Sequence, residues 1–368
     1  MVNGTEIKPT QNELSPSDFV RGRGERGLSA LSLFRILTAI YFALRLPWLL
    51  TLPVSEAPDE PNHFWVCHFL STHFTLPTAQ QVFAGGTPAE YGSLPPFGYL
   101  PHALISACFP EQMMPFVSRF GSLLAGLPAV WAAFAIGREI FPRTSLAALA
   151  LPLLIVVQPQ LVFVNSYTNT DSTTTSLTSI AILLVVLAIK RGLSMWQAVV
   201  AGFLLGWTAL SKHTGLCIVP ALGVGLLAAA FVHRDSVKSA AKKLGALAVV
   251  FLLTSAWWFV RNYHEFSGDW LGSKTMYETW AKILPRHNGQ IVHPWPPVSQ
   301  IGWWRYVFFD YWGLFGYMDR YLWRPIYIAY LGFVIASVIG WFKHSSWKRA
   351  HFRAGAAQTS VPAEGSGE

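Results

Sequence analysis

The chain has 368 residues, of which 52% are hydrophobic and only 12% are charged. An ordinary soluble domain carries about 25% charged residues, so this composition argues against a water-soluble enzyme and excludes collagen-like, disulfide-rich and disordered classes. The formal net charge of +8 fits the basic cytoplasmic loops of a membrane protein better than nucleic-acid binding. We therefore expect an all-α integral membrane protein with the lipid bilayer, and no nucleic acid, as a partner.

Apolar runs predict about eight membrane-spanning helices. The predicted spans are Leu31–Val54 and then roughly 115–137, 145–164, 173–189, 195–211, 214–232, 244–261 and 323–342. Residues 29–342 thus form one predicted transmembrane domain. Residues 1–28 lack an apolar period and are predicted to be a disordered cytoplasmic tail. Residues 343–368 are predicted to be a basic, then disordered, cytoplasmic tail.

Two long segments, 55–114 and 262–322, separate otherwise closely spaced spans. Both are rich in Pro, Trp, His and Tyr, and we expect them to contain interfacial helices and to carry the chemistry. The stretch Trp303–Asp319 is apolar but contains Arg305 and Asp310. It is predicted to be re-entrant or interfacial, because a ninth crossing would place the basic C-terminal tail outside.

Lys and Arg placement sets the predicted orientation, since short cytoplasmic loops carry the positive excess. One alternating assignment places the basic residues of every short loop on the same side, including Arg138, Lys190, Arg234 and Lys343. Both termini are then cytoplasmic and both long loops lie on the outer face.

The three cysteines, Cys67, Cys108 and Cys217, are too few and too scattered for a disulfide scaffold or a thiolate zinc site. A single bridge between Cys67 and Cys108 is an alternative on this topology. Buried free thiols are the favoured interpretation.

Two carboxylates and an imidazole follow the first predicted span. Asp59 and Glu60 are adjacent, and His63 comes four residues after Asp59. If Pro61 opens a helix at its first position, all three side chains converge at a helix start beside the bilayer. The alternative is a capping Asp59 with a solvated neighbour.

A second polar turn follows the third predicted span. It carries Asn169 and Asp171, and Asp171 is again an acidic residue at an outer helix start. Capping explains Asp171 taken alone. Asp171 is grouped with Asp59 because both are predicted to lie on the outer side of the membrane.

Cations at outer helix ends form the third candidate group. Lys212 with His213, and Arg261, lie at a depth where a cation needs an anionic partner or must snorkel. One interpretation is a pocket that binds a donor phosphate, and the other is contact with lipid headgroups. Arg119, on the same face, either joins this pocket or pairs with an acid.

No metal signature is strong. His63, His68 and His73 are spaced by five residues and do not share one helical face. A divalent ion held by Asp59, Glu60 and Asp171, with His63 nearby, stays open as an alternative, and no other cofactor is predicted. The proline- and aromatic-rich stretches Glu90–Leu104 and His293–Trp304 suit sugar rings and prenyl chains, or equally interface anchoring.

Five short motifs follow one another along the chain: Pro58–His63, Asn169–Asp171, Leu210–Lys212, Trp257–Tyr263 with Gly268 and Asp269, and Tyr311–Asp319. With these motifs the sequence resembles a family of bacterial multi-pass membrane proteins related to the GT-C glycosyltransferases, which include protein mannosyltransferases and aminoarabinose transferases. This resemblance implies a GT-C-like bundle, a polyprenyl-phosphate sugar donor and a bacterial inner or plasma membrane as the location. It also implies an acidic catalytic residue in the first outer loop, a position that Asp59 matches.

The leading hypothesis is a glycosyltransferase that moves a sugar from a polyprenyl phosphate to a saccharide, lipid or protein acceptor on the outer face. Asp59 is the expected general base. Glu60 shares the catalytic role or orients the acceptor, and His63, Asn169 and Asp171 support the acceptor or a metal ion. Lys212, His213 and Arg261 are expected to bind and stabilise the lipid phosphate. The alternatives are a transporter or flippase of lipid-linked saccharides and a non-catalytic subunit of an envelope polysaccharide complex.

Overall fold

The computed structural model describes residues 29–142, 145–283 and 299–358. The predicted tail at 1–28, residues 284–298 of the second long loop and residues 359–368 lie outside the described residues. The helices are α1 (Ala30–Thr51), α2 (Glu60–His73), α3 (Ala79–Gly85), α4 (Leu100–Ser106), α5 (Met114–Ile140), α6 (Ala147–Val157), α7 (Pro159–Val164), α8 (Asp171–Arg191), α9 (Met195–Ser211), α10 (His213–Val232), α11 (Val237–Glu265), α12 (Ser273–Ile283), α13 (Ile301–Gly313) and α14 (Arg324–Gln358). Short 3-10 helices are η1 (Ala89–Ser93), η2 (Phe97–Tyr99) and η3 (Glu111–Met113), and the strands β1 (Leu314–Phe315) and β2 (Arg320–Tyr321) form a small hairpin.

The all-α membrane class is confirmed. Within the described ranges, 6 helices are long and apolar enough to cross a membrane: α1, α5, α8, α10, α11 and the first part of α14. The remaining predicted spans coincide with shorter apolar helices, α6 and α9. Each predicted span therefore falls on helical structure, and the span 145–164 is divided between α6 and α7.

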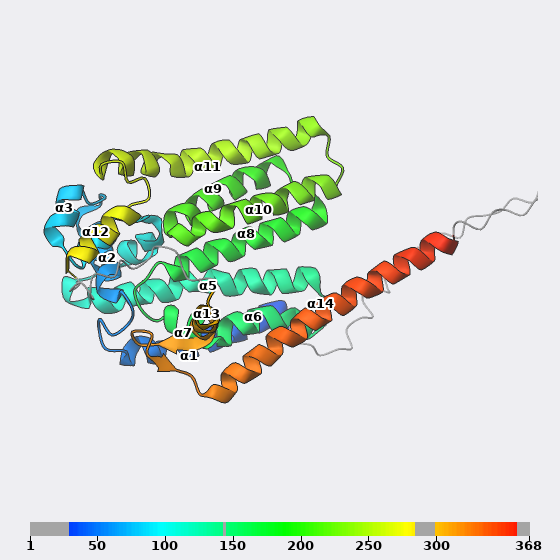
Figure 1. Cartoon of the computed structure of the whole chain (residues 1–368), viewed down its shortest axis with the longest axis horizontal. Helices are drawn as coiled ribbons and strands as arrows, with labels where there is room; N and C mark the ends of the chain where they lie inside the picture. Colours follow the sequence, from blue (N-terminus) through cyan, green and yellow to red (C-terminus); the bar gives the residue numbers. More distant parts are fainter. Residues whose placement is uncertain (1–28, 143–144, 284–298, 359–368) are drawn as a thin grey trace, which may run out of the picture.

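The helices form a bundle with an additional cap at one end. Helix α11 packs on α9, α9 and α10 pack on α8, α8 packs on α5, and α5 packs on α1 and α6. The helices α2, α3 and α12 from the two long loops gather at one end of this bundle, while α14 runs diagonally away from it (Figure 1). The long loops thus meet in space although they are far apart in the sequence.

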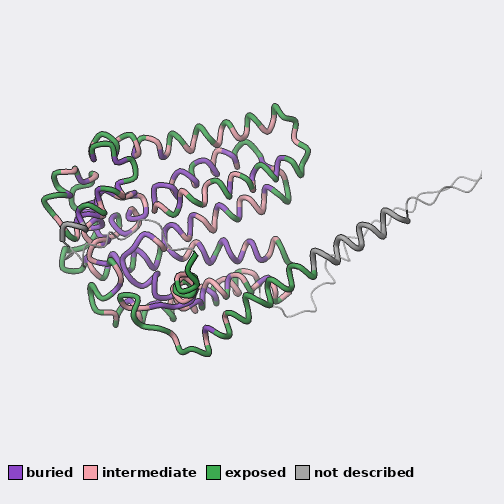
Figure 2. The backbone as a smooth tube through the Cα atoms, viewed as in Figure 1, coloured by how far each residue is buried: buried purple, intermediate pink, exposed green. Residues whose placement is uncertain are grey.

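Apolar side chains cover the outer surface of the bundle. In the apolar windows of α11 and α14, only 11% and 6% of the residues are buried inside the protein, and Figure 2 shows mainly exposed and intermediate residues along α11 and along the first part of α14. Exposed residues on them include Leu253, Val260, Ile328 and Trp341. A water-soluble surface rarely carries so much contiguous apolar area, so these faces suit contact with lipid.

The predicted span 145–164 is broken into α6 and α7. Pro159 occupies the first turn of α7 and Gln158 before it is extended, because proline disfavours helical backbone in the preceding residue. The carbonyls freed at the end of α6 are bound by the buried Arg45, which donates to Val156 O at 2.9 Å and to Ile155 O at 3.2 Å. Arg45 thereby satisfies polar backbone groups that lipid would leave unpaired.

The stretch 303–319 consists of the short helix α13 followed by the β1–β2 hairpin, and it is not among the spans long enough to cross a membrane. The basic segment after residue 343 continues α14 as far as Gln358. All three cysteines lie in the described part of the chain and are free, and only Cys67 is buried.

Candidate active site

A cavity of about 320 Å³ lies at the end of the bundle where the two long loops meet. Its walls come from the starts of α2, α8 and α10, from the end of α9, and from residues of both long loops. The predicted site residues that line it are Asp59, His63, Asp171, Lys212 and His213. The predicted site residues that do not line it are Glu60, Asn169 and Arg261.

Asp59 precedes α2 but does not cap it with its side chain. Its backbone is left-handed (φ 57°, ψ 8°), and its carboxylate makes no hydrogen bond to the first turn of α2. Asp tolerates this conformation better than most residues. The exposed carboxylate instead accepts a hydrogen bond from Tyr91 Oη at 2.9 Å. The capping alternative therefore finds no support in the geometry, and the carboxylate is free to meet a substrate.

His63 is a buried imidazole in the cavity wall. Its Nδ1 lies 2.6 Å from the hydroxyl of Tyr99, and its ring packs edge-on against Tyr91. Burial, with a smaller contribution from the positive charge of Lys212, lowers the pKa of His63 to about 3. At neutral pH His63 is an uncharged hydrogen-bonding group rather than a cation.

Tyr91 and Tyr99 remain protonated for the same reason. Burial raises the pKa of both phenols, and the negative charge of Asp59 adds to the shift. With Tyr167, they give the cavity three phenol rings. Aromatic faces and hydroxyl groups together are typical of sugar-binding surfaces.

Lys212 and Asp171 form an ion pair in the wall of the cavity. Lys212 Nζ donates to Asp171 Oδ1 at 2.6 Å, and each side chain is 36% exposed. Lys212 stands between the end of α9 and the start of α10, and no side chain caps α10. The first turn of α10, with His213 and Thr214, also lines the cavity. A helix start beside an ammonium group favours an anion at this position.

Asn169 is buried behind the cavity and fixes the start of α8. Its Oδ1 accepts hydrogen bonds from the backbone N–H of Asp171 at 2.8 Å and of Ser172 at 3.2 Å. Its amide nitrogen donates to Val164 O and Tyr167 O. Asn169 therefore positions Asp171 and is not itself available to an acceptor.

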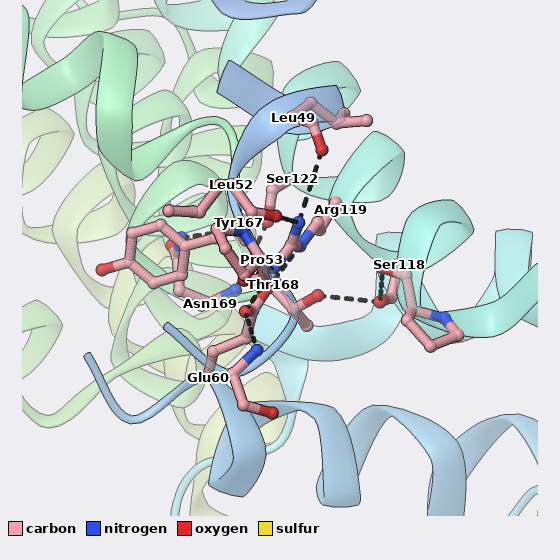
Figure 3. Close-up of polar contacts among 12 residues, drawn as sticks. Leu49, Leu52, Pro53, Glu60, Ser118, Arg119, Ser122, Tyr167, Thr168 and Asn169 are labelled. Atoms are coloured by element: carbon pink, nitrogen blue, oxygen red, sulfur yellow. Dashed lines mark hydrogen bonds and ion pairs between the residues drawn. The ribbon is translucent and has the colours of Figure 1, made fainter. Parts of the chain in front are cut away.

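Glu60 is turned away from the cavity, unlike its neighbour Asp59. Both of its oxygens bind the guanidinium of Arg119, each at 2.7 Å, and both side chains are almost fully buried (Figure 3). Glu60 also accepts from the backbone N–H of Ser55 and Thr168. Of the two alternatives for Arg119, pairing with an acid is the one observed. A carboxylate with these partners is not placed to act on a substrate.

Arg119 extends this buried pair to the end of α1. It donates to Leu52 O at 2.6 Å, to Pro53 O at 2.9 Å and to Leu49 O at 3.3 Å. The Glu60–Arg119 pair thus joins α1, α2, α5 and the turn before α8 (Figure 3). These are the elements that carry Asp59 and Asp171.

Arg261 lies outside the cavity, near the end of α11. Its guanidinium donates to Pro77 O at 2.6 Å and to Asn262 Oδ1 at 3.3 Å. It therefore ties α11 to the segment before α3. Arg261 therefore does not share the cavity with Lys212.

The predicted metal ligands do not come together. Within the described residues, no group of three or more His, Cys, Asp or Glu side chains is arranged to hold a metal ion. Both oxygens of Glu60 are used by Arg119, and Asp171 is paired with Lys212. In this arrangement these residues do not fit a divalent ion.

The second long loop closes one side of the cavity with two methionines. Met276 comes from α12 and Met318 from the tip of the β1–β2 hairpin. The neighbouring Tyr317 donates to Ser55 O at 2.6 Å, close to Asp59. Unbranched methionine side chains adapt to irregular ligands.

Sequence reasoning missed Tyr91, Tyr99, Tyr167 and Glu90 as individual residues. Tyr91 and Tyr99 belong to the aromatic-rich stretch Glu90–Leu104, but aromatic density does not show which rings face a cavity, and Tyr167 lies outside that stretch. Glu90 is buried beside them, and its Oε1 accepts from Asn62 at 2.5 Å. Burial raises the pKa of Glu90.

One family comparison bears on this arrangement. The family model described as dolichyl-phosphate-mannose-protein mannosyltransferase matches residues 93–259, from the end of η1 into α11. The chain is related to the GT-C glycosyltransferases. The GT-C match includes Asp171, Lys212 and the tyrosines Tyr99 and Tyr167, whereas Asp59 precedes it. No curated protein matches the chain. The GT-C relation and the apolar helices support a glycosyltransferase activity in a multi-pass membrane protein.

Proposed function

We propose that the protein transfers a sugar from a polyprenyl-phosphate donor to a hydroxyl acceptor on the outer face of the membrane. The observation that carries this proposal is the shared cavity. It presents the carboxylate of Asp59, which accepts a hydrogen bond from Tyr91, and the ammonium group of Lys212. A reaction that removes a proton at one end and releases a phosphate at the other needs both groups. The donor type and the outer-face location come from the GT-C relation and the charge pattern.

In the proposed reaction, the acceptor oxygen forms a bond to the anomeric carbon while the bond from that carbon to the phosphate oxygen breaks. The bonding electron pair leaves with the phosphate, and the hydroxyl proton goes to Asp59. Attack on the face opposite the phosphate inverts the anomeric carbon. Tyr91, which donates to Asp59 Oδ2, keeps the carboxylate oriented towards the acceptor.

Lys212 and the start of α10 form the proposed phosphate site. The ammonium group offers a point charge, and the uncapped helix start adds backbone N–H donors. His213 Nε2 donates to Leu271 O at 2.7 Å and holds the segment before α12 next to this site. The tyrosine rings of the cavity contact the sugar.

Cells that lack the protein provide a test, because an unused donor lipid should accumulate in them. Lipid extracts are separated by chromatography, and polyprenyl-phosphate sugars are identified by mass spectrometry. Wild-type protein and Arg261→Lys should both clear the accumulated donor, whereas Lys212→Met should not. Donor levels that stay unchanged on deletion would contradict the proposal.

A further inference from the structure

The ion pair between Lys212 and Asp171 occupies the place proposed for the donor phosphate. Both side chains line the cavity, and Lys212 Nζ lies 2.6 Å from Asp171 Oδ1. Each side chain is 36% exposed, so both can be reached by a ligand. A phosphate that binds Lys212 therefore meets a carboxylate already bound there.

The backbone on both sides of the pair is fixed. Asn169 caps the start of α8 through the N–H of Asp171, and Lys212 O accepts from the N–H of Gly215 at 2.8 Å. The Lys212 backbone itself is extended, with φ −163° and ψ 151°. Separation of the pair thus requires only rotation of side chains and no movement of helices.

After separation, both charges still have a favourable electrostatic environment. Asp171 stands in the first turn of α8, where the helix macrodipole stabilises a negative charge. Lys212 exchanges one anion for another. An ion pair this exposed changes an equilibrium by only about two- to fivefold, so a phosphate can displace the carboxylate.

We propose that Asp171 competes with the lipid phosphate for Lys212 and thereby speeds departure of the product. This inference rests on the proposed function. The donor is a phosphodiester with a single negative charge, while the product is a monoester with roughly −1.5 to −2. Lys212 alone would therefore hold the product more tightly than the donor, and product release would limit turnover. Competition from Asp171 weakens binding of the product, and of the donor by the same factor, so the product leaves sooner.

The test measures binding of farnesyl phosphate to purified wild-type protein and to Asp171→Asn. Asparagine removes the charge, and the Asn169 cap remains because it binds backbone N–H groups. We expect Asp171→Asn to bind farnesyl phosphate about two- to fivefold more tightly. Transfer in a single turnover should be retained, while steady-state turnover should fall after an initial burst. Asp171→Ser should shift binding in the same direction and serves if the asparagine variant folds poorly.

Glu139→Gln is the matched control, because Glu139 forms an ion pair with Lys190 at the other end of α8. It should bind farnesyl phosphate as the wild type does. Equal or weaker binding by both Asp171 variants would overturn the inference, since Asp171 would then not compete with the phosphate. Unchanged binding by Lys212→Met would instead reject the phosphate site and with it the proposed function.

Discussion

Asp59 and Glu60 are neighbours in the chain, yet their carboxylates lie in opposite environments. Asp59 is exposed in the cavity and bound by Tyr91, whereas Glu60 is buried against Arg119. Because the backbone at Asp59 is left-handed, the side chains of Asp59 and Glu60 point in different directions. One carboxylate is therefore available for chemistry, and the other holds the elements that position it.

The Glu60–Arg119 pair should be essential for stability. Glu60→Gln leaves the buried Arg119 without its counter-charge, and loss of one member of a buried pair costs about 3–5 kcal/mol. Thermal unfolding in detergent should show a clear decrease in Tm relative to the wild type. Glu56→Gln, which changes an exposed neighbour, is the control and should unfold like the wild type. Equal Tm values for all three proteins would show that the pair does not stabilise the fold.

His63 should contribute to loss of stability in acid. Its folded-state pKa of about 3 lies below the ordinary value of 6.5, because of burial and the charges of Lys212 and His102, with Asp171 acting in the opposite direction. Between pH 6.5 and 3 the unfolded chain binds a proton that the folded protein excludes, so stability falls as the pH falls. His63→Gln should flatten the dependence of Tm on pH in this window. His102, with a pKa lowered to about 4, contributes in the same direction and remains in both proteins.

The predicted orientation can be tested with single cysteines. Ala84→Cys lies in the first long loop and Lys238→Cys in the first turn of α11, after a short basic turn, and both positions are exposed. In a background without Cys67, Cys108 and Cys217, an impermeant thiol reagent should label position 84 in intact cells and position 238 only after lysis. The reverse pattern would invert the topology and place the cavity on the cytoplasmic side.

Much of the fold follows from sequence because hydropathy reports burial in lipid directly. The break between α6 and α7 was not predicted, although Pro159 was visible, because the bonds that make the break tolerable come from Arg45 on another helix. Hydropathy alone cannot show such a partner.

The candidate site was predictable only in part. Sidedness grouped Asp59, Asp171 and Lys212, and the structure places them around one cavity. Sidedness could not separate Glu60 from Asp59, since their difference depends on one backbone conformation and on Arg119. It also could not exclude Arg261, whose bond to Pro77 depends on tertiary packing.

Glycosyl transfer by Asp59→Asn tests the central claim most directly. Asparagine keeps the size of aspartate and tolerates left-handed backbone, but it cannot accept the acceptor's proton. Purified Asp59→Asn should bind the polyprenyl-phosphate sugar as the wild type does and should lose transfer by about a hundredfold or more. Wild-type transfer by this variant at equal protein levels would contradict the assignment of Asp59 as the general base.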